Sequence, residues 1–280
     1  MSDERGPGRL GIDAGASLWK LALLREDWET EILPAGAIDE VRRRVDAWQP
    51  ESVHVTGGGA PRVVAALDGI PVHQVSEFTA WARGAQWLAG RAGWTLPPRY
   101  LLVSLGTGTS ILEIDGEAMQ RVGGTALGGG TLLGLARLLC RTGSFAEIIA
   151  LAARGERGRV DLLVRDVYPE GGIALPPDLT AANFAKLDSS DPAGLPDPAD
   201  LAHALLGLIG ENVGITCAAI AHARSIETLV FGGSTLEANP TLQEILRRTV
   251  QMSGREALIL PGGAFCGAVG AAFTGGRTSA

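Results

Sequence analysis

Cysteine, aromatic residues and clustered positive charge are all scarce in this chain of 280 residues. The three cysteines, Cys140, Cys217 and Cys266, are far apart and lack the spacing of a zinc site or a disulfide framework, so we expect buried free thiols in a reducing compartment. The formal net charge is −7, and residues 42–44 form the only run of three basic residues. This balance argues against nucleic acid and against an anionic membrane as partners.

Long hydrophobic runs are absent too. Residues 1–9 are polar and lack the apolar core of a signal peptide, and no segment has the uninterrupted apolar length that a membrane helix needs. We therefore expect a cytoplasmic protein with no membrane partner. Ala, Leu, Val and Gly are abundant, and their small side chains suit close packing of helices on sheets, which favours an α/β fold.

Two glycine-rich turns are the most informative features that the sequence does contain. Residues 10–20 and 103–113 each run from an apolar strand through small and hydroxyl residues into a second apolar strand, the pattern of a tight hairpin. Glycine lets the backbone turn sharply and present amide hydrogens to an anion. Asp13 ends the first strand, and its carboxylate would repel a bare phosphate unless a divalent cation lay between them. The sequence thus predicts a magnesium-nucleotide site shared by two halves of the molecule.

The plan of strand, glycine turn and strand occurs in each half, which predicts a duplicated architecture. Residues 90–98 interrupt the pattern with Pro97 and Pro98, so we place the boundary between domains 1–96 and 97–280 there. In the first half we expect helices at 37–48, 61–67 and 77–88 and strands at 53–56 and 72–75. In the second half we expect strands at 100–105, 110–114, 117–122, 228–231 and 257–260, helices at 132–139, 145–153, 201–223, 240–252 and 264–273, and an irregular stretch at 161–200.

A further glycine-rich segment, residues 121–131, is predicted to be a loop that lets the backbone come close to a ligand. Residues 232–234 form a glycine turn at the end of a strand. There is no GxxxxGK[ST] loop, and the first turn leads to a strand rather than to a helix. Neither a P-loop nor a dinucleotide-binding fold is therefore indicated.

The order of these segments resembles the nucleotide fold of actin, sugar kinases and heat-shock chaperones, and more closely that of the type II pantothenate kinases. The resemblance extends from about Arg9 to Phe273. The motifs that carry it are Gly11-Ile12-Asp13-Ala14-Gly15, Glu77-Phe78-Thr79-Ala80, residues 104–110, Arg121-Val122-Gly123-Gly124-Thr125, Gly128-Gly129-Gly130, Asp178-Leu179-Thr180-Ala181-Ala182-Asn183-Phe184 and residues 262–270. The resemblance implies a two-domain actin-like (ribonuclease-H-like) α/β fold with mixed sheets and a nucleotide cleft between the domains.

The resemblance also implies an activity: phosphorylation of pantothenate by ATP and Mg²⁺, the first step of coenzyme A biosynthesis, in a homodimer joined through the second domain. It assigns Asp13 to the metal, Glu77 to deprotonation of the acceptor hydroxyl, and Arg121 to the acceptor or the transferred charge. The nucleotide-binding residues that it implies are Gly15, Ser17, Lys20, Gly106, Thr107, Gly108, Gly128, Gly129, Gly232, Gly233 and Ser234. The acceptor-binding residues that it implies are Ser104, Thr107, Thr109 and Arg121.

Simpler interpretations of these residues stay open at this point. Glu77 can stabilise a helix through the macrodipole, Arg121 can be an exposed charge at a strand end, and Lys20 can face outward from its strand. The hydroxyls of the second turn can brace a hairpin.

One departure from the family motif is material. The family usually has two glycines and a threonine after the aspartate, whereas this chain has Gly15-Ala16-Ser17. If Ala16 adopts a positive φ, its methyl group costs about 1 kcal/mol and crowds the phosphate. Two other functions therefore stay open: a kinase of the same fold that acts on another hydroxylated acceptor, such as an amino sugar, and a sensor that binds nucleotide or coenzyme A without catalysis.

Overall fold

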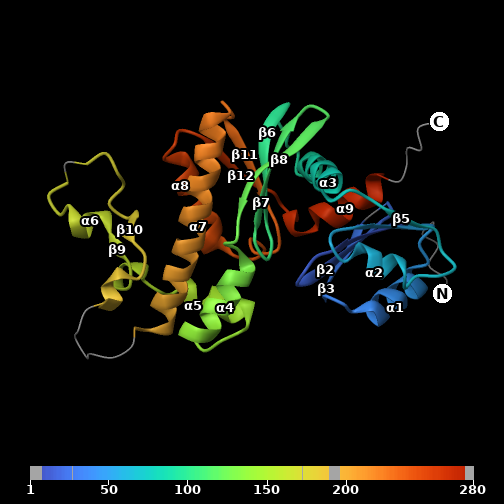
Figure 1. Cartoon of the computed structure of the whole chain (residues 1–280), viewed down its shortest axis with the longest axis horizontal. Coiled ribbons are helices and arrows are strands. Elements are labelled where there is room, and N and C mark those ends of the chain that lie inside the picture. Colours follow the sequence, from blue (N-terminus) through green and yellow to red (C-terminus); the bar gives the residue numbers. More distant parts are fainter. Residues whose placement is uncertain (1–7, 27, 172, 189–195, 275–280) are drawn as a thin grey trace.

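Two five-stranded sheets form the framework of the protein (Figure 1). The structure is a computed structural model that describes residues 8–26, 28–171, 173–188 and 196–274. The first sheet has the order β3-β2-β1-β4-β5, with β1 (Arg9–Ala14), β2 (Leu18–Leu24), β3 (Trp28–Pro34), β4 (Ser52–Thr56) and β5 (Val72–Gln74). Strands β1, β2 and β3 are antiparallel neighbours, whereas β4 and β5 run parallel to β1.

The second sheet repeats this topology. Its order is β12-β11-β6-β7-β8, with β6 (Arg99–Leu105), β7 (Thr109–Asp115), β8 (Ala118–Thr125), β11 (Thr228–Gly232) and β12 (Glu256–Ile259). Strands β6, β7 and β8 are antiparallel, and β11 and β12 run parallel to β6. The predicted duplication is confirmed, and the two glycine turns connect equivalent strand pairs, β1 with β2 and β6 with β7.

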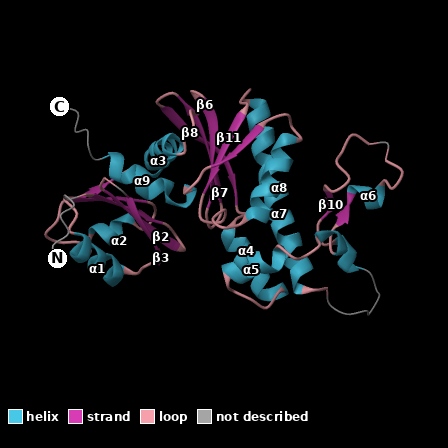
Figure 2. Cartoon of the chain, turned by 180° about the vertical axis from the view of Figure 1, so that it is seen from behind, coloured by secondary structure: helices cyan, strands magenta, loops and turns pink. Residues whose placement is uncertain are grey.

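Helices cover both sheets and also lie between them (Figures 1 and 2). The described helices are α1 (Ile38–Trp48), α2 (Ala60–Val64), α3 (Glu77–Arg91), α4 (Gly129–Leu139), α5 (Phe145–Ala152), α6 (Val164–Val167), α7 (Pro198–Ala223), α8 (Pro240–Gln251) and α9 (Cys266–Thr274). Val41 of α1 and Val63 of α2 pack on Ile12 and Val55 of the first sheet. Helices α3 and α9 occupy the space between the sheets.

Contact between α3 and α9 depends on glycine. A Cβ atom at Gly84 of α3 would lie 1.9 Å from the carbonyl oxygen of Cys266, and one at Gly270 of α9 would lie 1.7 Å from that of Ala80. Helix α3 belongs to the hydrophobic cluster of the second sheet, whereas α9 packs on the first sheet. Packing therefore crosses the expected boundary at residue 96 in both directions.

Helix α7 corrects one expectation. Contrary to the prediction that no segment could span a membrane, this 26-residue helix is long and apolar enough to do so by length and composition. However, 67% of its most apolar window is buried within the protein. Leu205, Ile209 and Val213 belong to the core cluster of the second half, together with Leu246 of α8. These contacts account for the apolar composition of α7.

The largest local difference from the predicted elements concerns the loop expected at residues 121–131. Strand β8 extends to Thr125 because it stays paired with β7 as far as Thr109, and α4 already begins at Gly129, so only residues 126–128 form a loop. The expected irregular stretch contains β9 (Leu162–Leu163) and β10 (Thr180–Ala182), which pair, together with α6. The three cysteines are buried and free, as predicted. The prediction that no signal peptide is present falls largely on residues 1–7, which lie outside the described residues.

Candidate active site

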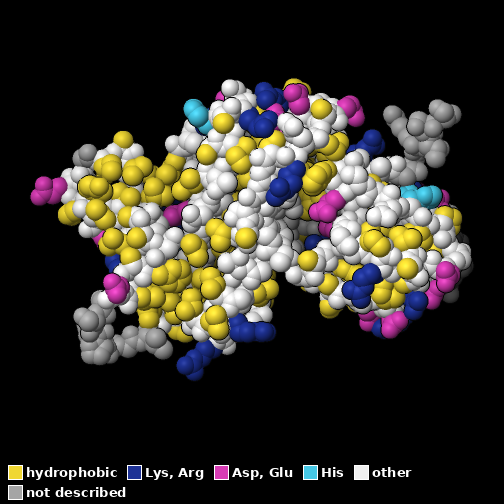
Figure 3. Space-filling view, viewed as in Figure 1, with side chains coloured by type: hydrophobic (Ala, Val, Ile, Leu, Met, Phe, Trp, Pro, Cys, Tyr) yellow, Lys and Arg dark blue, Asp and Glu magenta, His cyan; other side chains and the backbone are white. Residues whose placement is uncertain are grey.

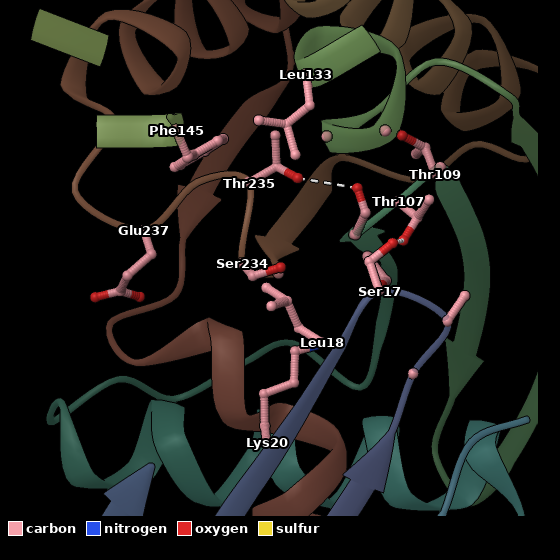
Figure 4. A pocket seen from close by; sticks show the side chains of 18 of the residues that line it. Ser17, Leu18, Lys20, Thr107, Thr109, Leu133, Phe145, Ser234, Thr235 and Glu237 are labelled. Carbon is pink, nitrogen blue, oxygen red and sulfur yellow. Dashed lines mark hydrogen bonds between the residues drawn. The ribbon is translucent and has the colours of Figure 1, made fainter. Parts of the chain in front are cut away.

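One large cavity receives both glycine turns (Figure 4). Its volume is about 910 Å³, which lies within the range of small-molecule sites. Asp13, Lys20 and Glu77 line it beside the first sheet, and the side chains of Leu133 and Phe145 line it on the far side of the turns. The cavity thus joins charged groups of the first half to backbone turns and apolar helices of the second half.

Asp13 is a buried carboxylate at the end of β1. Its side chain is confined by glycines, because a Cβ atom at Gly267 would lie 2.8 Å from its carboxylate carbon and one at Gly57 would lie 3.0 Å from Oδ1. Lys20 Nζ lies 3.7 Å from Asp13 Oδ2 and is itself almost fully buried. Burial raises the pKa of Asp13, and the positive charge of Lys20 opposes that rise. Lys20 therefore does not face outward from its strand; it balances Asp13 inside the cavity.

Glu77 is the first residue of α3 and faces the same cavity as Asp13. Its side chain stays open to the cavity, but loss of solvent around the carboxylate raises its pKa, and the negative charge of Asp13 raises it further. The Ser76 side chain does not cap this helix. Glu77 is thus a carboxylate at the N-terminus of a helix that also faces the cavity, so its position is compatible with both interpretations given above.

The second turn is held rigidly by hydrogen bonds from behind. The amides of Gly129 and Gly130 donate to the carbonyl oxygens of Gly106 and Thr107 at 2.8 and 2.9 Å. The Thr235 hydroxyl also donates to the carbonyl oxygen of Gly106, at 2.9 Å (Figure 4). These bonds engage the carbonyl groups of Gly106 and Thr107 and the first two amides of α4. Gly129 was predicted to bind nucleotide; in the structure its amide holds the second turn in place.

Hydroxyl groups of the two turns meet across the cavity. Ser17 Oγ and Thr107 Oγ1 lie 2.9 Å apart, although 90 positions separate them in the chain. Thr109, by contrast, donates its hydroxyl to the carbonyl oxygen of Leu127 at 2.7 Å, which braces the hairpin. Ala16 does not adopt a positive φ, so the backbone strain that a positive φ would cause is absent from the first turn. This chain's departure from the family motif at Ala16 therefore causes no backbone strain.

The cavity collects most of the predicted site residues, with three exceptions. Residues that line it as predicted are Asp13, Gly15, Ser17, Lys20, Glu77, Ser104, Gly106, Thr107, Gly108, Thr109, Gly129, Gly233 and Ser234. Gly128 lies behind the second turn, and Gly232 packs against Trp81 and Gly263. Arg121 is exposed on the edge strand β8, where its Nε donates to the Ser110 hydroxyl at 3.3 Å. Ser110 lines the cavity, so Arg121 stands one hydrogen bond away from it.

Sequence reasoning missed the apolar parts of this cavity. Leu133 of α4 and Phe145 and Ile149 of α5 line it on one side, and Trp81 of α3 lines it near Glu77. Helical spacing was a usable signal for Trp81, because residues four apart in a helix share a face. No local signal could place α4 and α5 beside the turns, since that contact depends on how distant elements pack.

A divalent cation has a suitable but small set of protein ligands here. The described residues contain no group of three or more His, Cys, Asp or Glu side chains able to hold a metal ion. Mg²⁺ is commonly bound by one or two carboxylates together with substrate phosphates and water. Asp13 and Glu77 provide such carboxylates in the same cavity as the two glycine turns, so the donor set suits an ion that arrives with a nucleotide.

Comparison with known proteins places the chain in a family. The family model described as Fumble matches residues 36–274. A type II pantothenate kinase of Oceanobacillus iheyensis is 34% identical over 265 residues, which are 94% of this chain and 98% of that protein. The chain belongs to the type II pantothenate kinase family. Another type II pantothenate kinase, from Staphylococcus aureus strain MRSA252, is 32% identical over 270 residues, covering 95% of this chain and 99% of the relative.

Solved structures share the fold of this type II pantothenate kinase family member. The activator of the 2-hydroxyisocaproyl-CoA dehydratase from Clostridium difficile, with bound ADPNP, has a TM-score of 0.63 and 16% identity, covering 95% of this chain and 93% of that chain. A ROK family glucokinase from Streptomyces griseus, in complex with glucose and AMPPNP, has a TM-score of 0.56 and 16% identity. The match covers 95% of this chain and 98% of that chain. At this identity the likeness concerns the fold alone, and it confirms the two-domain actin-like α/β architecture.

Proposed function

We propose that this protein transfers the γ-phosphoryl group of ATP to the primary hydroxyl of pantothenate and forms 4′-phosphopantothenate, the first step of coenzyme A biosynthesis. Its full-length relatives are type II pantothenate kinases. The observation in the structure that carries the proposal is the cavity in which Asp13 and Glu77 face two glycine turns. Phosphoryl transfer needs these parts: groups that hold the phosphates, and a carboxylate that accepts the hydroxyl proton.

Each residue then has a task that its surroundings support. The turns at residues 15–17 and 106–108 hold the phosphates of ATP, and Lys20 adds positive charge beside Asp13. A magnesium ion, when bound with ATP at Asp13, neutralises phosphate charge. Glu77 accepts the proton of the acceptor hydroxyl, and its raised pKa strengthens it as a base. Arg121 supports the acceptor or the transferred charge at the rim, next to Ser110.

The two alternative functions lose part of their support. The departure at Ala16 permits a sensor of nucleotide or coenzyme A, but Ala16 has no positive φ, so the backbone strain that would weaken nucleotide binding is absent. A kinase for an amino sugar would need polar partners for several hydroxyl groups, whereas Leu18, Ile32 and Trp81 provide apolar walls beside Glu77. Product analysis with both acceptors separates these functions directly.

The proposed assembly is a homodimer in the cytoplasm. The segment from β9 to β10 projects from the body and carries many hydrophobic side chains on its surface (Figure 3). Val167, Tyr168 and Leu175 are among its exposed large hydrophobic residues. Such a surface favours burial against a second copy. Buried free thiols agree with a reducing compartment.

The decisive experiment is mass-spectrometric detection of 4′-phosphopantothenate after purified protein is incubated with ATP, Mg²⁺ and pantothenate. We expect product from the native protein, and turnover reduced by about 10² to 10⁴-fold in Glu77→Gln with unchanged ATP affinity. Glu117→Gln, an exposed carboxylate outside the cavity, is the matched control and keeps native turnover. Product from an amino sugar instead of pantothenate would transfer the proposal to that acceptor, and ATP binding with no product from either would favour the sensor.

A further inference from the structure

Trp81 shares its helix face with the proposed base. Helix α3 begins at Glu77, and Trp81 follows one turn later, so both side chains point into the same cavity. Trp81 is only 6% exposed. Gly232 lies against its indole: a Cβ atom at Gly232 would lie 3.4 Å from Trp81 Cζ3, an ordinary van der Waals distance. The ring is thus fixed within a packed wall and has little freedom to move aside.

The first sheet supplies an apolar surface to the same end of the cavity. Ile32 pairs with Lys20 in the β2-β3 register, so their side chains lie on one face of the sheet, and Leu18 lies two residues before Lys20 on that face. In Figure 4, Leu18 lies below Ser17 and Ser234, and Lys20 lies lower still on the same strand. Asp13, the cross-strand partner of Lys20, lies on the same face, and apart from these two charged residues the side chains named here are hydrocarbon. The carboxylates therefore stand between apolar walls.

We propose that Trp81 determines acceptor specificity by packing on alkyl groups next to the reacting hydroxyl. This inference rests on the proposed function. Pantothenate carries its primary hydroxyl on a CH₂ group attached to a carbon with two methyl groups, and such a branched apolar shoulder suits the indole. A polyol placed there would lose water from its hydroxyls without gaining partners, which is unfavourable. Trp81 is a specificity residue and takes no part in proton transfer.

The test combines changes in the enzyme with a change in the acceptor. The acceptors are pantothenate and the analogue in which both methyl groups beside the CH₂OH group are replaced by hydrogen. In the native protein we expect kcat/KM to fall by at least about 10-fold on removal of the methyl groups. In Trp81→Ala, kcat/KM for pantothenate is expected to fall by about the same factor, but removal of the methyl groups is expected to change it by no more than about twofold. Trp81→Phe is expected to recover part of the discrimination.

Trp87 provides the matched control on the same helix. It packs edge-on against Trp28, with ring centroids 5.5 Å apart, and it does not line the cavity. Trp87→Ala is expected to leave the effect of methyl removal at its native size, whatever it does to stability. The ratio of the kcat/KM values of two acceptors, measured on one protein preparation, is independent of the fraction that is folded. A poorly folding variant therefore still shows the effect of methyl removal.

Three outcomes overturn the inference. The first is a native protein that uses both acceptors equally well, which needs no variant. The second is an unchanged response to methyl removal in both Trp81 variants, which would leave Trp81 a purely structural residue while pantothenate kinase activity stands. The third is a native protein that phosphorylates neither acceptor, which would overturn the proposed function together with the inference.

Discussion

Substitution of Gly84 by alanine tests whether the contact between α3 and α9 positions the carboxylates. A Cβ atom at Gly84 would lie 1.9 Å from the carbonyl oxygen of Cys266, whereas real Cβ atoms essentially never approach below 3.0 Å. The two helices must therefore separate by about 1 Å at this point. Because α3 begins at Glu77 and the start of α9 confines Asp13, this separation moves the two carboxylates relative to each other. A misplacement of about 1 Å can cost about 100-fold in rate.

Gly90 is the matched control, since it lies on the same helix with nothing within 4 Å of its Cβ position. Gly90→Ala is expected to keep native turnover and to gain up to about 1 kcal/mol from helix propensity. Gly84→Ala is expected to lose about 1–3 kcal/mol of unfolding free energy through overpacking, and to lose turnover by about 10 to 100-fold. Urea unfolding and single-turnover kinetics measure the two effects. Equal stability and turnover in both variants would refute the idea that this contact positions the site.

Three further predictions concern titratable groups. Glu77 must be ionised to accept a proton, so kcat is expected to fall as pH decreases through its raised pKa, and a pH profile with its acidic limb at or below pH 4.5 would contradict this. Burial lowers the pKa of His54 to about 4 from 6.5, so the folded protein excludes a proton that the unfolded chain binds. Unfolding free energy is therefore expected to decline by about 3 kcal/mol as pH falls from 6.5 towards 4, and urea titrations of His54→Phe should lack this component. Lys20→Met leaves the buried Asp13 carboxylate unpaired, so we expect the free energy of unfolding to fall by about 3 kcal/mol. Adding Asp13→Asn is expected to restore part of this loss, and a double variant that melts no higher than Lys20→Met would contradict the pairing.

Local patterns were sufficient for the two turns and for most of the elements, but not for β3 or for the short elements β9, α6 and β10. Apolar runs that end in small and hydroxyl residues predicted both hairpins, and the recurrence of this plan predicted the duplicated sheets. The same local reasoning failed for residues 121–131, where pairing with β7 extended a strand through glycines that read as a loop. It also underestimated α7, whose membrane-like composition is explained only by the elements packed around it.

The sequence by itself determined the two hairpins and the recurrence of their plan, because each glycine turn and its flanking strands lie close together in the chain. The roles of Asp13, Glu77 and Arg121 rest on the family resemblance and stay predictions. Only the tertiary structure decided that Lys20 turns inward to Asp13, that Ser17 meets Thr107, and that Arg121 stays one hydrogen bond outside the cavity. It also brought Trp81 and the helices α4 and α5 to the cavity walls. These arrangements follow from packing between distant elements, where glycines such as Gly84 and Gly270 set how closely two helices approach, and no local pattern records that distance.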